Sequence, residues 1–150
     1  MADNFKINWV LNNELALGSA PLENSHIKLL KEEGLVSILS LCSEEEAKPP
    51  EGIEKLFRSK RIVLPDHSYS RSLKLEELQK VLQVLEGLSL FGPVFVHCKA
   101  AVERSPLICM AWLIKKHKLN PIQALDYLMR INKGTSPMQN QLKLLYELKK

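Results

Sequence analysis

The chain has 150 residues, of which 45% are hydrophobic, and its 21 basic and 17 acidic side chains give a formal net charge of +4. This length favours a single domain spanning residues 1–150, and the hydrophobic content is ordinary for a protein that builds a core. The basic excess is weak, and its densest cluster, KKHK at residues 115–118, is typical of a solvated helix end, so we expect no nucleic-acid partner.

Short strand-like runs alternate along the chain with helical patterns, which is typical of α/β proteins. Strands are expected at residues 8–11, 15–20, 35–42 and 92–98, with one or two more within 53–65 after an acidic loop at 43–52. Helices are expected at 22–33, from 75 to a glycine at 87 or 92, and at 105–117, 122–131 and 138–148. The last two helices are each preceded by an N-cap residue and a proline, Asn120–Pro121 and Ser136–Pro137. The pattern predicts a central, mostly parallel twisted sheet of about four or five strands flanked by helices on both faces.

The cysteine pattern and the first residues of the chain are typical of a protein from a reducing, intracellular compartment. Cys42, Cys98 and Cys109 are odd in number and show neither a C-x-x-C pair nor zinc-ligand spacing. The opening MADNFKINWVL lacks the basic region of a signal peptide, and no apolar stretch approaches the roughly 20 residues of a spanning helix. We therefore expect a cytoplasmic protein with no membrane partner, metal or cofactor, in which a thiol is either buried filler or part of the chemistry.

The segment VFVHCKAAVERSPLICMAWL, residues 94–113, joins the most strand-like run to an apolar helix through a polar bend. Amides of the bend and the N-terminus of the helix would together form an anion site, and their positive field favours a thiolate at Cys98. Arg104 supplies a planar fork for two phosphate oxygens, and the Ser105 hydroxyl can donate to the sulfur. The alternative is a buried, inert Cys98 with Arg104 on the surface of the helix.

A thiolate above which a phosphate is bound could act as the nucleophile of a cysteine-dependent phosphatase. Such an enzyme also needs a group that protonates the leaving alcohol. Asp66 in VLPDHS, residues 63–68, follows an expected strand end and a proline, which makes it the candidate. His67 is the second possible donor. Without the cysteine motif, Asp66 would be read as a plain turn residue or helix cap.

HCKAAVERSP resembles the signature loop H-C-x5-R-[ST] of the dual-specificity, cysteine-dependent phosphatases in the protein-tyrosine-phosphatase superfamily. LALGSAP, GLVSILSLC, IVLPDHSYS and TSPMQNQL are similar to other segments of that family, so the resemblance covers nearly all of the chain. It implies the family's fold, with Cys98 as nucleophile, Asp66 as general acid, Arg104 as phosphate clamp, Ser105 as thiolate partner and His97 as a support beneath the loop. It also implies that backbone amides of the bend form the phosphate-binding site, here called the cradle; they are those of Lys99, Ala100, Ala101, Val102, Glu103 and Arg104. It further implies that Gln139 or Gln141 helps to place the hydrolytic water.

One position departs from the family pattern, which usually has glycine where this chain has Ala101. A tight anion-binding loop needs residues with positive φ, and alanine adopts that conformation at a cost of about 1–2 kcal/mol. We hypothesise that Ala101 is left-handed and that the cradle is intact. The departure makes reduced activity, or a non-catalytic module, the competing interpretation.

Cys42 ends an expected parallel strand and should emerge at the same sheet edge as Cys98. This placement would permit a protective Cys42–Cys98 disulfide under oxidation, and the alternative is a buried filler cysteine. Cys109, on an apolar helix, is expected in the core.

Three functions fit the pattern. The first is a phosphomonoester hydrolase, a tyrosine or dual-specificity protein phosphatase that acts through phosphocysteine on Cys98. The second is a phosphate-binding module without turnover, and the third is a sulfurtransferase of the rhodanese kind, which the Cys–Arg spacing disfavours. Phosphoinositide, glucan phosphate and RNA 5′-phosphates also fit the first class, and Lys99 beside the cradle would suit a polyanionic substrate. The sequence predicts neither the substrate nor the oligomeric state.

Overall fold

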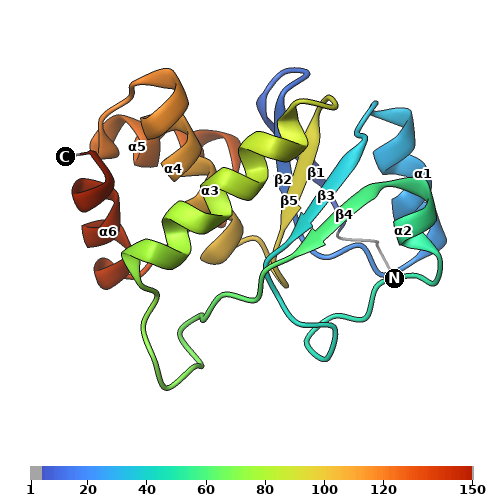
Figure 1. Ribbon diagram of the computed structural model, residues 1–150, viewed down its shortest axis with the longest axis horizontal. Helices are drawn as coiled ribbons and strands as arrows, with labels where there is room; N and C mark the ends of the chain where they lie inside the picture. Colours follow the sequence, from blue (N-terminus) through green and yellow to red (C-terminus); the bar gives the residue numbers. More distant parts are fainter. Residues whose placement is uncertain (1–4, 150) are drawn as a thin grey trace.

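Five strands form one twisted sheet in the computed structural model, which describes residues 5–149 (Figure 1). The strands are β1 (Ile7–Leu11), β2 (Leu15–Gly18), β3 (Ser37–Ser40), β4 (Arg58–Arg61) and β5 (Val94–His97), in the spatial order β1-β2-β5-β3-β4. β1 and β2 pair antiparallel, whereas the β2–β5, β5–β3 and β3–β4 pairs are parallel. The predicted α/β fold with a mostly parallel sheet is confirmed.

Helices cover both faces of this sheet. They are α1 (Asn24–Glu32), α2 (Ile53–Leu56), α3 (Leu75–Ser89), α4 (Arg104–His117), α5 (Pro121–Ile131) and α6 (Gln139–Lys149). α1 and α2 lie on one face and α3 to α6 on the other (Figure 1). Alternation along β5 divides the core accordingly, because Val94 and Val96 pack with the α3–α6 residues while Phe95 packs with those of α1 and α2.

The central strand β5 sets the position of the bend that follows it. All four of its residues are buried, as expected for a parallel strand covered on both sides. His97 stands opposite Gly18 of β2 and Ser40 of β3. Cys98 and the residues after Ser40 therefore leave the sheet at the same edge.

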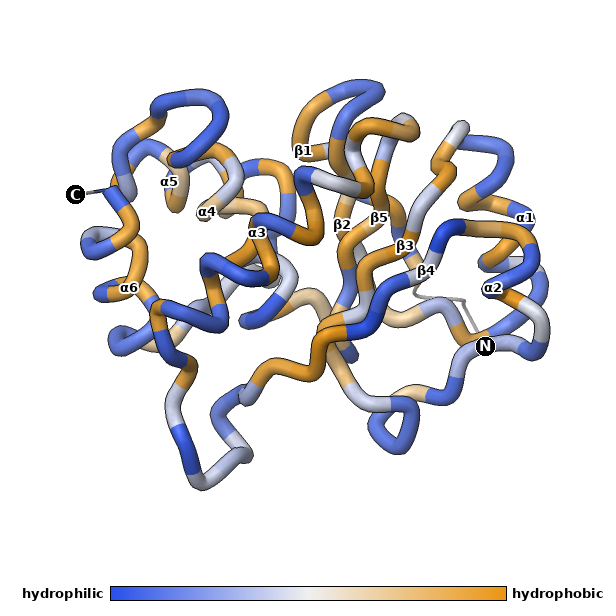
Figure 2. The backbone as a smooth tube through the Cα atoms, in the orientation of Figure 1, coloured by the Kyte–Doolittle hydropathy of each residue, from blue (hydrophilic) through white to orange (hydrophobic). Residues whose placement is uncertain are grey.

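Segment 53–65 contains one strand, as predicted, and also a short helix that the sequence analysis did not predict. It begins with the short helix α2 and continues as β4, whose residues RSKR are mostly exposed. Strand β4 is at the sheet edge, which Figure 2 shows as a hydrophilic stretch beside the apolar central strands. Lysine and arginine suit this place because charged side chains discourage pairing with another chain at an open edge.

The predicted helices lie within about three residues of their expected bounds. Asn120 caps α5 by accepting a 2.9 Å hydrogen bond from the Gln123 amide, as its Asn-Pro start predicted. Helix α3 runs through Gly87, and Gly92, with φ of 128°, turns the chain into β5. Helix α6 begins only at Gln139, so Ser136 and Pro137 lie outside it and the prediction that they start this helix is wrong.

The predicted core and surface assignments hold in α4. Cys109 is fully buried, as expected, and the basic KKHK cluster forms the last turn and end of the helix. Within the described part of the chain, no helix combines the length and apolar character needed to cross a membrane.

Candidate active site

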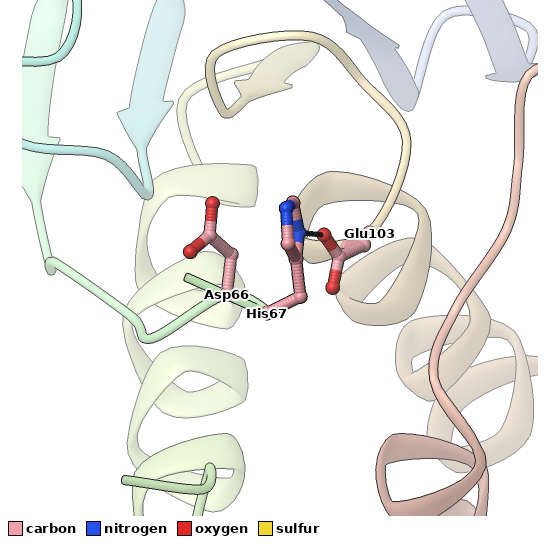
Figure 3. Close-up of side chains that lie close together, drawn as sticks. All are labelled: Asp66, His67 and Glu103. Atoms are coloured by element: carbon pink, nitrogen blue, oxygen red, sulfur yellow. Dashed lines mark hydrogen bonds and ion pairs between the residues drawn. The ribbon is translucent and has the colours of Figure 1, made fainter. Parts of the chain in front are cut away.

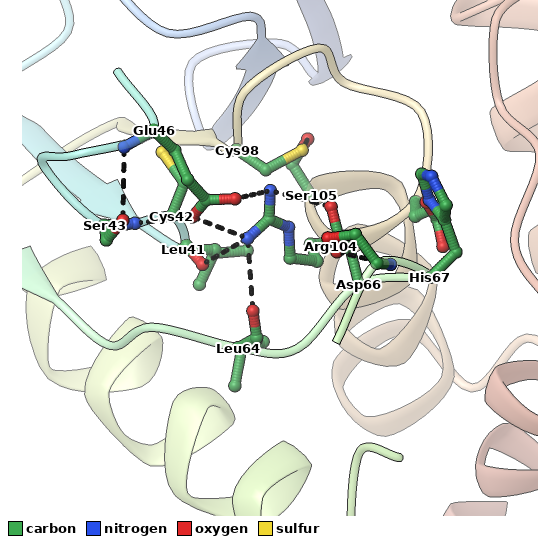
Figure 4. A network of polar contacts seen from close by, with 12 residues as sticks. Leu41, Cys42, Ser43, Glu46, Leu64, Asp66, His67, Cys98, Arg104 and Ser105 are labelled. Carbon is green, nitrogen blue, oxygen red and sulfur yellow. Dashed lines mark hydrogen bonds and ion pairs between the residues drawn. The ribbon is translucent and has the colours of Figure 1, made fainter. Parts of the chain in front are cut away.

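The bend between β5 and α4 places a thiol beside a hydroxyl. Cys98 follows the last residue of β5, and its Sγ lies 3.3 Å from Oγ of Ser105 in the first turn of α4 (Figure 4). Cys98 is 2% exposed and Ser105 is fully buried. Cys98 lines a pocket of about 470 Å³ together with Glu46, Asp66, His67, Ser68, Lys99, Ala100, Val102, Glu103 and Arg104.

The backbone of Ala101 is left-handed, with φ of 59°, so this prediction is confirmed. Asn132, just after α5, holds the strained residue by donating from Nδ2 to the Ala101 carbonyl at 2.9 Å. The adjoining Val102 carbonyl accepts from the Ser136 amide, also at 2.9 Å. The segment from 132 to 136 thus supports the bend. This role is not evident from the sequence, in which Asn132 is only a residue at a helix end.

His97 lies beneath the bend, as predicted. Its Nδ1 is 3.1 Å from the Cys98 carbonyl oxygen and its Nε2 is 2.7 Å from Ser40 Oγ. A carbonyl only accepts, so Nδ1 carries the proton and the Ser40 hydroxyl donates to Nε2. Burial is the main cause that lowers the pKa of His97 to about 4, which keeps the imidazole neutral at physiological pH.

Arg104 is held by a carboxylate that the sequence analysis did not single out. Glu46 accepts from both terminal nitrogens of the buried guanidinium, at 3.1 and 3.2 Å, and the Leu64 carbonyl accepts a further bond at 3.1 Å (Figure 4). Partial burial raises the pKa of Glu46, but hydrogen bonds from Arg104 and the Ser43 amide outweigh that effect and lower it. In sequence, Glu46 is one of several acidic residues in a loop, and only its place after a parallel strand hinted at the site.

Asp66 also lines the pocket, with Oδ2 3.5 Å from Nη2 of Arg104. Its Oδ1 accepts from the amide and the hydroxyl of Ser68, at 2.9 and 2.5 Å. Partial burial raises the pKa of Asp66, but the Ser68 bonds and the Arg104 charge outweigh it and lower the pKa below its usual value. Asp66 is therefore ionised at neutral pH in the free protein.

His67, beside Asp66, contacts the bend directly. Its Nδ1 meets Oε2 of Glu103, and this contact is the main cause that raises the pKa of His67 (Figure 3). Among the described residues, Asp66, His67 and Glu103 bring one nitrogen and two carboxylate oxygens within 4.8 Å of one another. His67 contacts only Oε2 of Glu103, and Ser68 hydrogen-bonds to Oδ1 of Asp66. We assign no metal here.

The accessory residues lie apart from the pocket wall. Cys42 is fully buried, burial raises its pKa, and its carbonyl accepts from Arg61. All three cysteines are free, and the Cys42–Cys98 disulfide stays a prediction. Gln141 is 2% exposed and caps α6 by accepting from the Met138 amide at 2.8 Å, while Gln139 lines a different hollow with Lys143. This geometry disfavours both glutamines as water-placing residues.

Comparison with protein families agrees with this geometry. The family model described as the dual specificity phosphatase catalytic domain matches residues 16–150. The chain belongs to this family. The matched region includes the bend between β5 and α4, with Cys98, Arg104 and Ser105, and also the segment that carries Asp66.

Two curated relatives of this dual specificity phosphatase are from mouse. "Phosphatidylglycerophosphatase and protein-tyrosine phosphatase 1" is 26% identical over 144 residues, covering 93% of this chain and 75% of the relative. "Dual specificity protein phosphatase 2" is 29% identical over 124 residues, covering 82% of this chain and 37% of the relative. Among solved structures, a crystal structure of PTPMT1 is 25% identical, with a TM-score of 0.80 over 96% of this chain and 94% of that one.

Proposed function

We propose that this domain, residues 1–150, is a phosphomonoester hydrolase of the tyrosine or dual-specificity type that acts through phosphocysteine on Cys98. The observation that carries the proposal is the Cys98 sulfur, 3.3 Å from the Ser105 hydroxyl, in a pocket that Arg104 and Asp66 also line. A sulfur with a hydroxyl donor, a phosphate-binding guanidinium and a proton donor are the groups that this chemistry needs.

The reaction has two displacements at phosphorus. In the first, the Cys98 thiolate forms the S–P bond while the P–O bond to the leaving group breaks, and Asp66 gives its proton to the departing oxygen. In the second, water attacks the phosphocysteine, the Asp66 carboxylate takes a proton from that water, and the S–P bond breaks to release inorganic phosphate. The Ser105 hydroxyl donates to the sulfur when the thiolate reforms.

Binding of the phosphate would rearrange the charges around Arg104. In the free protein Glu46 and Asp66 lie against the guanidinium, at 3.1 and 3.5 Å. A phosphate dianion placed over the bend brings further negative charge close to Asp66, which favours the protonated form of this carboxyl group. Substrate binding therefore prepares the acid that the first displacement needs.

The substrate can be a phosphoprotein or a smaller phosphomonoester. Relatives matched over most of their own length carry the name phosphatidylglycerophosphatase together with protein-tyrosine phosphatase, and this favours a phospholipid headgroup as the second candidate substrate. Lys99, exposed beside Cys98, places a cation at the rim that suits an additional anionic group. The three free thiols are compatible with action in the reducing cytoplasm.

Hydrolysis of a chromogenic aryl phosphate tests the proposal. Cys98→Ser should abolish turnover, and Asp66→Ala should lower kcat by about 10²–10⁴-fold with a leaving group that needs protonation. Cys109→Ala, which removes a buried thiol of α4 that does not line the pocket, is the matched control and should keep the activity. Phosphopeptide binding without turnover would instead indicate a binding module, and a thiosulfate-dependent persulfide on Cys98 would indicate a sulfurtransferase.

A panel then separates the substrates. A phosphotyrosine peptide, phosphatidylglycerophosphate and phosphoinositides in mixed micelles are compared with the Cys98→Ser protein as background. A kcat/KM for one class at least about tenfold above the others assigns the substrate class.

A further inference from the structure

The phosphate-binding bend contains a buried carboxylate of its own. Glu103 is the residue before Arg104, in the N-cap position of α4, and is only 8% exposed. Its Oε1 has no hydrogen-bond partner among the residues that the structure describes. A negative charge in this place opposes the binding of a phosphate dianion to the amides of the same bend, because the charges share a site with little water.

The charge of Glu103 is met by a side chain from another loop. His67, from the segment that carries Asp66, places Nδ1 against Glu103 Oε2 and leaves its side chain 69% exposed at the rim of the pocket (Figure 3). Glu103 and Asp66 both favour the protonated imidazole, whereas Arg104 opposes it. The pair therefore ties the acid loop to the bend across 36 residues of sequence.

We propose that His67 is a charge-compensating and positioning residue for phosphate binding, whose imidazolium cancels the charge of Glu103 and holds the Asp66 loop over Cys98. This inference rests on the proposed hydrolase function, because it assigns the pair a part in accepting the phosphate of that reaction. Figure 4 shows His67 next to Asp66, on the side of the pocket away from Glu46. Glu46 and Asp66 both face Arg104, whereas Glu103 meets the separate cation of His67.

The assignment predicts a pH dependence of anion affinity. As pH rises through the raised pKa of His67, the imidazole loses its proton, Glu103 is left uncompensated, and affinity for a dianion falls. In a Cys98→Ser background, His67 is the one pocket-lining residue whose ordinary pKa lies between about pH 6 and about pH 8.5. His97 lies outside this lining, and its pKa of about 4 keeps it neutral throughout.

A double-mutant cycle on anion binding tests the inference. Sulfate, a dianion at each pH used, is titrated by NMR into the Cys98→Ser protein with EDTA present, and into the same protein carrying His67→Ala, Glu103→Gln or both. His67→Ala should weaken sulfate binding about tenfold at about pH 6, and Glu103→Gln should bind at least as tightly as the parent. The double variant should return to within about twofold of the parent, because neither charge is then present.

A conservative variant and a stability measurement complete the test. His67→Lys keeps a cation beside Glu103, so its sulfate affinity should change less than about twofold between about pH 6 and about pH 8.5. Thermal unfolding checks that each variant is folded. A double variant that binds sulfate as weakly as His67→Ala would overturn the inference. Absence of phosphoester turnover in the wild-type protein would instead contradict the proposed function and leave the result of the sulfate cycle unaffected.

Discussion

Asn132→Ala should destabilise the protein and impair the bend around Cys98 at the same time. Asn132 is 7% exposed, and its side chain donates to the Ala101 carbonyl and accepts from Asn8 Nδ2, both at 2.9 Å. Removing the amide leaves the Ala101 carbonyl buried without this partner, which costs about 1–3 kcal/mol, and the lost Asn8 bond adds about 1 kcal/mol. The free energy of unfolding should therefore fall by about 3 kcal/mol, which lowers Tm by about 6–12 °C.

The activity should fall as well, because Asn132 holds Ala101 in a conformation that alanine avoids by about 1–2 kcal/mol. When the bend relaxes, its amides move from the phosphate oxygens, and we expect kcat/KM for an aryl phosphate to drop about 10–100-fold. Calorimetry and steady-state kinetics measure the two effects. The control is Asn120→Ala, which removes the exposed cap of α5, costs about 1 kcal/mol and leaves kcat/KM unchanged. An Asn132→Ala protein with wild-type kcat/KM would refute the argument that Asn132 maintains the bend.

Three other variants test neighbouring parts of the site. Glu46→Gln should lower the free energy of unfolding by about 2–3 kcal/mol, because buried Arg104 loses the nearer of its two charged partners. The pKa of Glu46 is lowered, so ionised Glu46 stabilises the fold above about pH 4.5, and this stabilisation is lost as pH falls through its folded-state pKa. Glu46→Gln should therefore flatten the dependence of Tm on pH below about pH 4.5. Ser68→Ala removes a bond that lowers the pKa of Asp66, so the pKa rises and the alkaline fall of kcat/KM moves to higher pH. Ala101→Gly removes about 1–2 kcal/mol of backbone strain, which stabilises the folded protein. It also loses the burial of a methyl group and makes the unfolded chain more flexible, which destabilises the folded protein. Because these effects oppose each other, its stability and kcat/KM should stay near wild type.

The sequence predicted those parts of the fold and site that depend on neighbours along the chain. The apolar run before Cys98 and the apolar helix after Arg104 are local patterns, and they located the bend and the sheet edge. The positive φ of Ala101 was expected from the family resemblance, because the family pattern usually has glycine at this position of a tight anion-binding loop. Cys109 is a core residue for the same reason, since an apolar helical pattern surrounds it.

The contacts that complete the site join residues far apart in the chain and left no local signal. Glu46 and Arg104 are separated by 58 residues, and Ala101 and Asn132 by 31. Their meeting depends on which strands and helices are neighbours in the folded protein. Helix α2 was missed for a different reason, because its four residues are too few to show a helical period.

The central claim is that the Cys98 sulfur attacks phosphorus and carries the phosphate during turnover. The most direct measurement is acid quenching of the protein during turnover of an aryl phosphate, followed by mass spectrometry of the peptide that contains Cys98. We expect a phosphate group on Cys98 in the wild-type protein, and neither this adduct nor turnover in Cys98→Ser. Hydrolysis that continues in the Cys98→Ser protein, or wild-type turnover that leaves Cys98 unmodified in the quenched samples, would contradict the claim.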